Sequence, residues 1–243
     1  MNRYFYDLHI HSCLSPCADN DMTPNNIAGM AVLNGLQIVA LTDHNSTKNC
    51  RAFFAAAKKH GIIPVAGMEM TTAEDIHLVC LFPSLEAAED FDAVYQSHRI
   101  LYPNRPDIFG EQLILDENDE IVGREDHLLL NASDLSVPDA VKLLEQYKAV
   151  VFPAHIDREE NGMIASLGCI PDEPHFHCVE FRDKSSAGIY VPKYGLEDKR
   201  ILTDSDAHYL WDISEAENFL SLEDEPYSSA RVRESLFRFL GGK

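Results

Sequence analysis

The chain has 243 residues, of which 45% are hydrophobic and 25% charged, a composition typical of a folded globular protein. Forty acidic residues against 20 basic ones give a formal net charge of −20, which disfavours binding to long nucleic acids and to anionic membranes. We identify no signal peptide and no apolar run of about 18 residues. We therefore expect no membrane partner and a cytoplasmic location, where the six scattered cysteines would be free thiols.

Strand-like and helix-like segments alternate along the chain. Apolar runs rich in Val, Ile, Leu and Phe predict seven strands, at 5–10, 37–41, 62–67, 77–82, 149–153, 178–181 and 200–203. Helical patterns occur at 24–33, from Ser46 as the N-cap to about residue 60, and at 85–98, 137–147 and 229–240. This alternation predicts an α/β fold, in which helices cover a parallel sheet that is either open or closed into a barrel.

Residues 102–130 interrupt the alternation, because they contain two prolines, two glycines and an acidic run between short apolar pieces. A long irregular segment in a compact domain is either a functional lid or an excursion without a role. Cationic side chains lie near both of its ends and can meet a phosphorylated ligand, namely Arg99, Arg105, Arg124 and His127. We find no internal linker, so we predict one domain over residues 1–243 with an irregular excursion at about 102–130.

Side chains that bind metals recur at the ends of the predicted strands. His9 and His11 point the same way on the first strand and can bind one metal together. Most of the others follow a strand, although His77 opens one. The remaining members of the set are Asp43, His44, Glu69, His77, His155, Asp206 and His208. One such histidine can be a structural residue, but the whole set at the carboxyl ends of strands predicts a metal site.

Three further features bear on this site. His175 and His177 form a similar pair but precede the strand at 178–181, so we expect them at the opposite end of the sheet. Asp204 shares strand parity with Asp206 and is expected to orient a ligand. Cys17 is either a soft ligand or a packed loop thiol.

The ordered motifs resemble those of the PHP (polymerase and histidinol phosphatase) family. They are Asp-Leu-His-Ile-His-Ser at 7–12, Thr-Asp-His-Asn at 42–45, Gly-Met-Glu at 67–69, the later His77, Ala-His at 154–155 and Ser-Asp-Ala-His at 205–208. The resemblance implies a distorted (β/α)7 barrel with parallel strands and a trinuclear metal site at their C-terminal ends. Two or three divalent ions of zinc, manganese or iron are expected. The implied ligands are His9, His11, Glu69 and Asp206 for the first metal, Glu69, His77 and His155 for the second, and His44 and His208 for the third.

The resemblance leaves the last ligand of the third metal open among Asp19, Cys17 and Asp21. Family members often have an Asp five residues before the proline of the first helix, which favours Asp19 ahead of Pro24. Others have a histidine six residues after the second His of the first motif, which is the position of Cys17.

Closely spaced divalent metals suit phosphoester hydrolysis, because they lower the pKa of water to roughly 7 and stabilise the developing charge. Glu69, Asp206, Arg158 and Arg182 are the expected catalytic residues, although Arg182 fits a surface salt bridge equally well. We predict an enzyme that hydrolyses a phosphomonoester, either a nucleotide or a small phosphorylated metabolite, through a metal-activated hydroxide. The alternatives are an exonuclease-type phosphodiesterase on short oligonucleotides and a non-catalytic, metal-stabilised domain that binds partners. A metal-dependent amidohydrolase is disfavoured because no lysine at a strand end is available as a bridge.

Overall fold

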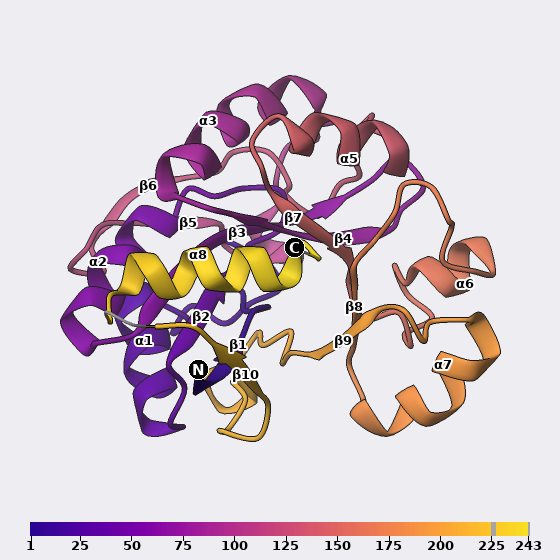
Figure 1. Ribbon diagram of the computed structural model, residues 1–243. Helices are drawn as coiled ribbons and strands as arrows, with labels where there is room; N and C mark the ends of the chain where they lie inside the picture. The colour runs from indigo at the N-terminus through magenta and orange to yellow at the C-terminus, as the bar shows by residue number, and fades with distance from the viewer. Residues whose placement is uncertain (225–226, 243) are drawn as a thin grey trace.

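The seven predicted strands form the wall of a distorted barrel in the computed structural model, which describes residues 1–224 and 227–242. They are β1 (Asn2–Asp7), β2 (Ile38–Leu41), β3 (Ile63–Thr71), β4 (His77–Phe82), β7 (Val150–Pro153), β8 (Cys178–Phe181) and β9 (Arg200–Thr203). The strand order is β10 (Phe219–Leu222), β1, β2, β3, β4, β7 in one sheet and β8, β9 in another. Near β7 and β8, Ile156 N–H donates to the Glu180 carbonyl, and Ile10 pairs with Ala207 between β1 and β9. These contacts join the two sheets into the curled wall seen in Figure 1.

The prediction that all strands run parallel is wrong for β4. This strand runs antiparallel to both of its neighbours, β3 and β7. Only residues 72–76 separate β3 from β4, and a parallel crossover needs a dozen or more residues. The reversal brings His77, the first residue of β4, to the barrel end where the parallel strands have their carboxyl ends. The reversed strand therefore explains why this one predicted ligand opens a strand instead of following it.

Helices surround the barrel, and α8 crosses one of its ends (Figure 1). The predicted helices are present as α1 (Pro24–Leu33), α2 (Cys50–His60), α3 (Leu85–Tyr95) continued by η1 (Gln96–His98), α5 (Val137–Glu145) and α8 (Ser229–Leu240). Not predicted were α6 (Met163–Leu167), α7 (Ala187–Tyr194), η2 (Lys184–Ser186) and η3 (Leu210–Asp212). Side chains accept first-turn N–H groups at Thr23, Ser84, Ser136 and Ser228. None of the described helices is long and apolar enough to cross a membrane.

The start of α2 differs from the prediction. Ser46 is not its N-cap, because the helix begins only after Asn49. The Asn49 amide is used elsewhere, since it donates to Ser12 Oγ and to the Leu113 carbonyl. The predicted end is confirmed, with Gly61 at φ 74° after the helix.

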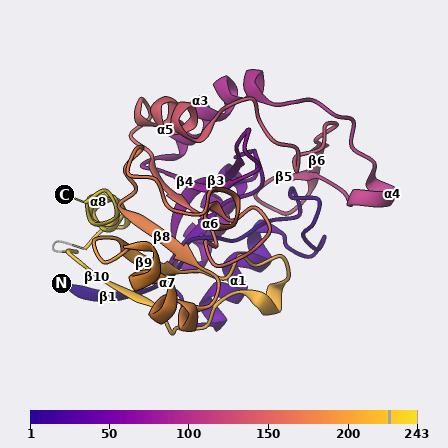
Figure 2. The ribbon, with the colours of Figure 1, turned by 90° about the vertical axis from the view of Figure 1, so that its right-hand side faces the viewer.

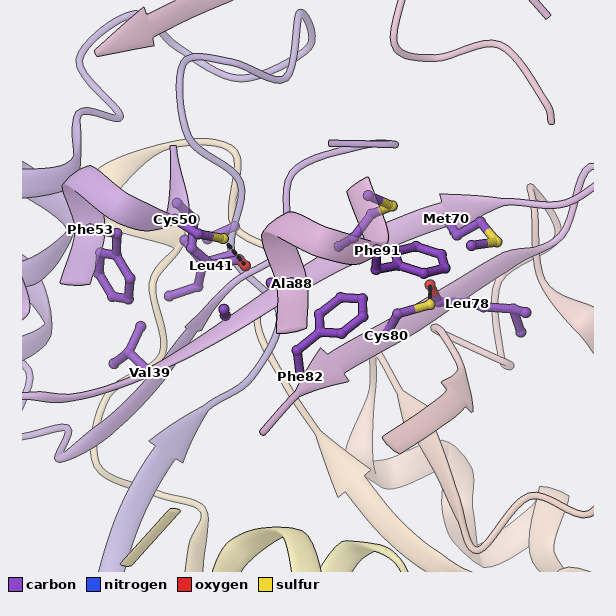
Figure 3. Close-up of a cluster of buried hydrophobic side chains, with 14 of the residues drawn as sticks. Val39, Leu41, Cys50, Phe53, Met70, Leu78, Cys80, Phe82, Ala88 and Phe91 are labelled. Carbon is purple, nitrogen blue, oxygen red and sulfur yellow. Dashed lines mark hydrogen bonds between the residues drawn. The ribbon is translucent and has the colours of Figure 1, made fainter. Parts of the chain in front are cut away.

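Alternating strand residues build two apolar layers. Val39 and Leu41 face the helices, where they lie in one buried cluster with Phe53 of α2 and Phe91 of α3 (Figure 3). Their neighbours Ile38 and Ala40 belong to the other cluster, inside the barrel, which Val232, Leu236 and Leu240 of α8 complete. Burying each large side chain contributes about 1.5–3 kcal/mol. The wall that carries the polar strand ends is therefore packed on both faces.

The excursion at 102–130 is more regular than predicted, because it contains α4 (Pro106–Phe109) and a hairpin of β5 (Leu113–Leu115) and β6 (Ile121–Arg124). Figure 2 shows α4 and the hairpin at the barrel end opposite α8. Leu113 N–H donates to the Cys13 carbonyl. Gly110 has φ +100°, and a Cβ there would lie 2.1 Å from the Pro16 carbonyl oxygen. The excursion therefore packs against the loop that follows β1.

The cationic side chains of the excursion have acidic partners. Arg99 is buried and pairs with Glu125 at 3.3 Å, and Lys48 pairs with the same carboxylate. The two exposed arginines pair within the excursion, Arg105 with Asp107 and Arg124 with Glu111. His127 Nδ1 lies 3.8 Å from Glu125. Arg99 is thus engaged in packing the excursion, and the idea that it meets a phosphorylated ligand loses support.

Candidate metal centre

Glu69 of β3 lies at the centre of the clustered side chains and is fully buried. Its Oε1 atom lies 2.8 Å from Nδ1 of His77. The same oxygen lies 3.2 Å from Nε2 of His9 and 3.2 Å from Nε2 of His155. Strands β1, β4 and β7 therefore each direct an imidazole toward one oxygen of this carboxylate.

The second oxygen of Glu69 faces two more imidazoles. Oε2 lies 2.9 Å from His44 Nδ1 and 3.5 Å from His11 Nε2. Although these two atoms are close, Glu69 Oε2 and His44 Nδ1 form no hydrogen bond with each other or with any other described residue, and both are buried. Unpartnered buried lone pairs are costly unless something else satisfies them. Two such atoms converging with further nitrogen and oxygen donors fit ligands of a shared divalent cation.

The candidate ligand atoms form three overlapping sets, with the atoms of each set within 4.8 Å of one another. One set holds the four side chains predicted for the first metal. The second set contains His44 in place of the predicted His155, which is in none of the three sets, and the third set adds His11 to the predicted His44 and His208. The sets are His9, His11, Glu69 and Asp206, then His44, Glu69 and His77, then His11, His44 and His208. Imidazole and carboxylate donors suit zinc, manganese and iron, so the residues present fit the expected ions.

The electrostatics of the cluster also suit a cation. Burial raises the pKa of Glu69, but the surrounding His77 and His9 imidazoles outweigh burial and hold this pKa well below its usual range. Burial likewise raises the pKa of Asp206, and His9 and His11 lower it far more. For His11, burial and neighbouring imidazoles depress the pKa well below 6.5. The carboxylates are therefore ionised and His11 is neutral at pH 7, the forms that bind a metal. Burial lowers the pKa of His9 and His44, but the anionic groups around them hold both pKa values well above 6.5, so these two rings would lose a proton on binding a metal.

Sequence reasoning missed Glu180 of β8, a buried residue that orients two of the predicted ligands. Its carboxylate oxygens lie 3.0 and 3.1 Å from His9 Nδ1, so the other ring nitrogen of His9 faces the cluster. The same carboxylate accepts the N–H of His155 at 3.0 Å. Partners of this kind fix the orientation of metal-binding histidines. A signal was available, because Glu180 is the only charged residue in the fully buried strand Cys178–Phe181.

Two other acidic residues at strand ends support the site through the backbone or neighbouring side chains. Asp43 accepts hydrogen bonds from both Ser12 and Ser15, and Ser15 Oγ lies 3.1 Å from His11 Nδ1. Asp204 accepts the N–H of Leu8 at 2.6 Å. It therefore ties β9 to β1 beside His9. Within the described residues it makes no hydrogen bond to a ligand side chain, so the prediction that it orients one is not supported.

Three residues at the site have a left-handed backbone, which is costly for a residue other than glycine. His155 has φ 27°, Asp206 has φ 49°, and Asn45, next to His44, has φ 50°. The Asn45 side chain accepts the Thr71 N–H and donates to the Leu129 carbonyl, which holds this conformation. Two predicted ligands, His155 and Asp206, thus have a strained backbone, a feature that recurs at functional sites.

The two predicted arginines differ in position. Arg158 Nη1 lies 2.8 Å from Asp206 Oδ2, and its side chain is 39% exposed, so Arg158 connects the cluster to solvent. Arg182 is exposed just beyond β8, where its backbone N–H donates to Asp157. Within 1–224 and 227–242, no contact joins the Arg182 side chain to the clustered ligands.

The loop after β1 brings Asp19 and Cys17 near the third set of ligands. Asp19 donates its N–H to the His208 carbonyl, but its Oδ1 accepts the Asp21 N–H within the loop. Cys17, an exposed residue of this loop, lies near His44 and His208. Burial of the sulfur raises its pKa, and the two imidazoles together lower it to about 6.

His175 and His177 lie away from this centre, as predicted. They line a cleft of about 830 Å³ together with residues of α5 and α8. In Figure 2, α8 lies at the end of the barrel opposite α4 and the hairpin.

The comparisons with known proteins agree with this geometry. The PHP domain matches residues 7–151. A 5'-3' exoribonuclease of Haemophilus influenzae is 31% identical over 111 residues, which are 44% of this chain and 39% of that protein. The lesion-specific endonuclease PfuEndoQ from Pyrococcus furiosus superposes with a TM-score of 0.69 at 18% identity, over 99% of this chain and 56% of that chain. A protein described as a metal-dependent phosphoesterase from Bifidobacterium adolescentis superposes with a TM-score of 0.62 at 17% identity, over 96% of each chain.

The chain spans well under two thirds of the exoribonuclease and of the endonuclease that it matches. The structural likenesses, each under 25% identity, support the barrel fold. The PHP match covers more than half of the chain and includes the motifs at 7–12, 42–45 and 67–69 together with His77. The chain therefore belongs to the PHP domain family.

Proposed function

We propose that this chain hydrolyses phosphate esters of small molecules, with a nucleotide phosphomonoester as the preferred substrate. The observation that carries the proposal is one buried carboxylate, that of Glu69, with five imidazoles around its two oxygens. Its two oxygens suit two adjacent metals. Two or three divalent ions of zinc, manganese or iron bound there would polarise phosphoryl oxygens and supply a nucleophile from water near neutral pH.

The chain's own residues would position the substrate and the ligands. Arg158 extends from Asp206 toward solvent, where its Nη2 lies 3.5 Å from the exposed Glu160, and its guanidinium suits the non-bridging oxygens of a phosphoryl group. Glu180 holds His9 and the backbone of His155 in place, so little reorganisation is needed when charge develops on the phosphoryl group.

A pair of aromatic rings supports a nucleotide over an aliphatic phosphate. Tyr209 and Trp211 directly follow His208 and stack with ring centroids 4.9 Å apart. Trp211 is 76% exposed, an unusual exposure for a large apolar ring. Stacking of a base on an aromatic ring is worth about 1–3 kcal/mol. We infer that this pair is where the base of the substrate binds.

The second candidate is an exonuclease-type phosphodiesterase that acts on short oligonucleotides. It is favoured by the 31% identity to the 5'-3' exoribonuclease. Structural neighbours include endonuclease Q in complex with a 27-mer duplex substrate. The formal charge of −20 opposes binding of long strands, which is why we place short oligonucleotides second. In both cases we propose a cytoplasmic enzyme.

The test is a substrate screen with metal-stripped protein that has been reloaded with zinc, manganese or ferrous iron. Substrates are nucleoside 5'- and 3'-monophosphates, histidinol phosphate, glycerol phosphate and short 5'-phosphorylated RNAs. We expect turnover of nucleoside monophosphates and a loss of at least about 100-fold in Glu69→Gln, with an unchanged circular dichroism spectrum. Release of mononucleotides from RNA would favour the second candidate. A parent protein that binds the metals but turns over none of these substrates would indicate a non-catalytic, metal-stabilised domain.

A further inference from the structure

Ser15, in the loop after β1, contacts two of the candidate ligands at once. Its hydroxyl oxygen lies 3.1 Å from Nδ1 of His11 and accepts the backbone N–H of His44, also at 3.1 Å. The same oxygen lies 2.7 Å from Oδ1 of Asp43. None of these four residues is more than 4% exposed, so their polar groups depend on one another for hydrogen bonds and not on bulk water.

The direction of the hydrogen bond between Ser15 and Asp43 follows from a fixed donor. Asp43 Oδ1 accepts the backbone N–H of Ser12 at 2.7 Å, and its Oδ2 accepts the Ser12 hydroxyl at 2.6 Å. A backbone N–H can only donate, so Oδ1 is an acceptor. The Ser15 hydroxyl therefore donates its single proton to this oxygen.

A hydroxyl that has donated its proton can only accept further hydrogen bonds. The Ser15 oxygen uses one lone pair for the His44 N–H, which leaves the other for His11. His11 therefore carries a proton on Nδ1. In the neutral ring the other nitrogen, Nε2, keeps a free lone pair. It faces the cluster, 3.2 Å from Asp206 Oδ1 and 3.5 Å from Glu69 Oε2.

The neighbouring ring of His9 has the same arrangement. Its Nδ1 lies 3.0 Å from the Glu180 carboxylate, so its Nε2 also faces the cluster, 3.2 Å from Nε2 of His11. Once His9 has lost its cluster-facing proton, neither Nε2 atom can donate to the other, and a shared cation satisfies both. The tautomer of His11 that Ser15 selects is thus the one that a metal ligand needs.

We propose that Ser15 is a positioning residue of the metal centre, which fixes His11 with its proton on Nδ1 and its Nε2 directed at the metal. The inference rests on the metal centre of the proposed function but not on its substrate. His11 is common to the first and third candidate sets, and Ser15 also holds the backbone of His44. Loss of this one hydroxyl should therefore weaken binding at both positions.

Isotope-edited NMR of the histidine ring nitrogens in the metal-free full chain tests the proposal directly, because a protonated ring nitrogen differs in chemical shift from a bare one. Signals that are absent from His11→Gln identify the His11 ring. We expect its proton on Nδ1 in the parent. In Ser15→Ala we expect the proton to move to Nε2, toward Asp206, and zinc to bind about 10–100-fold more weakly.

Ser12→Ala is the matched control. Ser12 donates to the same carboxylate as Ser15, but among the described residues its hydroxyl makes no hydrogen bond to a candidate ligand. This variant should keep the proton on Nδ1 of His11 and bind zinc nearly as tightly as the parent.

The possible outcomes separate the two proposals. A parent whose His11 Nδ1 carries no proton overturns the role of Ser15, even if Ser15→Ala fails to fold. Unchanged zinc affinity in folded Ser15→Ala, or an equal loss in Ser12→Ala, overturns it as well, because the hydroxyl would then contribute only to packing. Zinc binding with the expected tautomer but without hydrolysis of any substrate would leave the role of Ser15 standing and remove the proposed function. Hydrolysis by a parent with the His11 proton on Nε2 would do the reverse.

Discussion

Replacement of Glu180 tests whether a residue that contacts no substrate controls the metal centre. Glu180→Gln retains the shape and the Oε1 acceptor but removes the charge. Glu180→Ala removes the hydrogen bonds both to His9 Nδ1 and to the N–H of His155. Glu159→Gln is the matched control, because Glu159 is an exposed glutamate near the same end of the barrel.

The expected magnitude follows from these buried contacts. Hydrogen bonds to charged groups contribute about 1.5–3 kcal/mol each, and loss of such a partner typically weakens metal binding or activity by about 10–100-fold. In Glu180→Gln the His9 contact remains but the charge is lost, so we expect roughly a 10-fold loss of metal affinity. In Glu180→Ala, His9 is free to rotate and the His155 N–H is unpaired, so we expect about a 100-fold loss of metal affinity.

Metal affinity would be measured by competition with a chromophoric chelator, alongside thermal unfolding with and without metal. Binding to the folded state alone at 100 times Kd stabilises by about 2.7 kcal/mol, and each kcal/mol shifts Tm by about 2–4 °C for a domain of this size. The rise in Tm on adding metal should therefore be largest for the parent, smaller for Glu180→Gln and smallest for Glu180→Ala. The reasoning fails if folded Glu180→Ala binds metal as tightly as the parent, or if Glu159→Gln loses as much affinity as Glu180→Gln.

Three further predictions follow from particular contacts. Burial raises the pKa of Asp92 to about 6, against the opposing charge of Lys48. Because the folded-state value lies above the unfolded one, ionised Asp92 costs stability above about pH 6, and the cost fades as the pH falls toward 4. Asp92→Asn should thus raise the free energy of unfolding by about 2 kcal/mol at pH 8 and by almost nothing at about pH 3.5 in denaturant titrations; equal gains at both values would contradict this. Trp211→Ala should lower kcat/KM for nucleotides by about 5–100-fold and spare glycerol phosphate. Nucleotide binding should quench the fluorescence of Trp211, the only tryptophan in the sequence, and an equal loss on both substrates would rule out base stacking. Gly110→Ala places a Cβ against the Pro16 carbonyl at positive φ, so it should lower Tm and reduce kcat/KM; unchanged values would show that the excursion does not support the loop after β1.

Much of the site could be predicted from the sequence because its pattern is local. Apolar runs bounded by turns mark the seven strands, and a polar residue placed just after such a run must lie near the barrel rim. His9, Glu69 and Asp206 were grouped in this way, and their ligand atoms lie together in one set. A role of the excursion at 102–130 as a functional lid stays a prediction.

Strand direction could not be read from the same pattern. The apolar run that begins at His77 looks alike whether the strand is parallel or antiparallel, and the turn at 72–76 decides between them. The partner of Arg99 could not be predicted from the sequence either, because its ion pair with Glu125 depends on how the excursion folds back on itself.

Contacts between distant parts of the chain were decided by the tertiary structure alone. His9 and Glu180 are 171 positions apart, and they meet only because β8 and β9 complete the barrel beside β1. The orientation of the loop after β1 is set by Asp43, His208 and the excursion, none of which is its neighbour in sequence. Residue types and their spacing determined which groups gather at the barrel rim. Closure of the barrel determined which of them touch, because a side chain's partner depends on the backbone packed against it and not on its own neighbours along the chain.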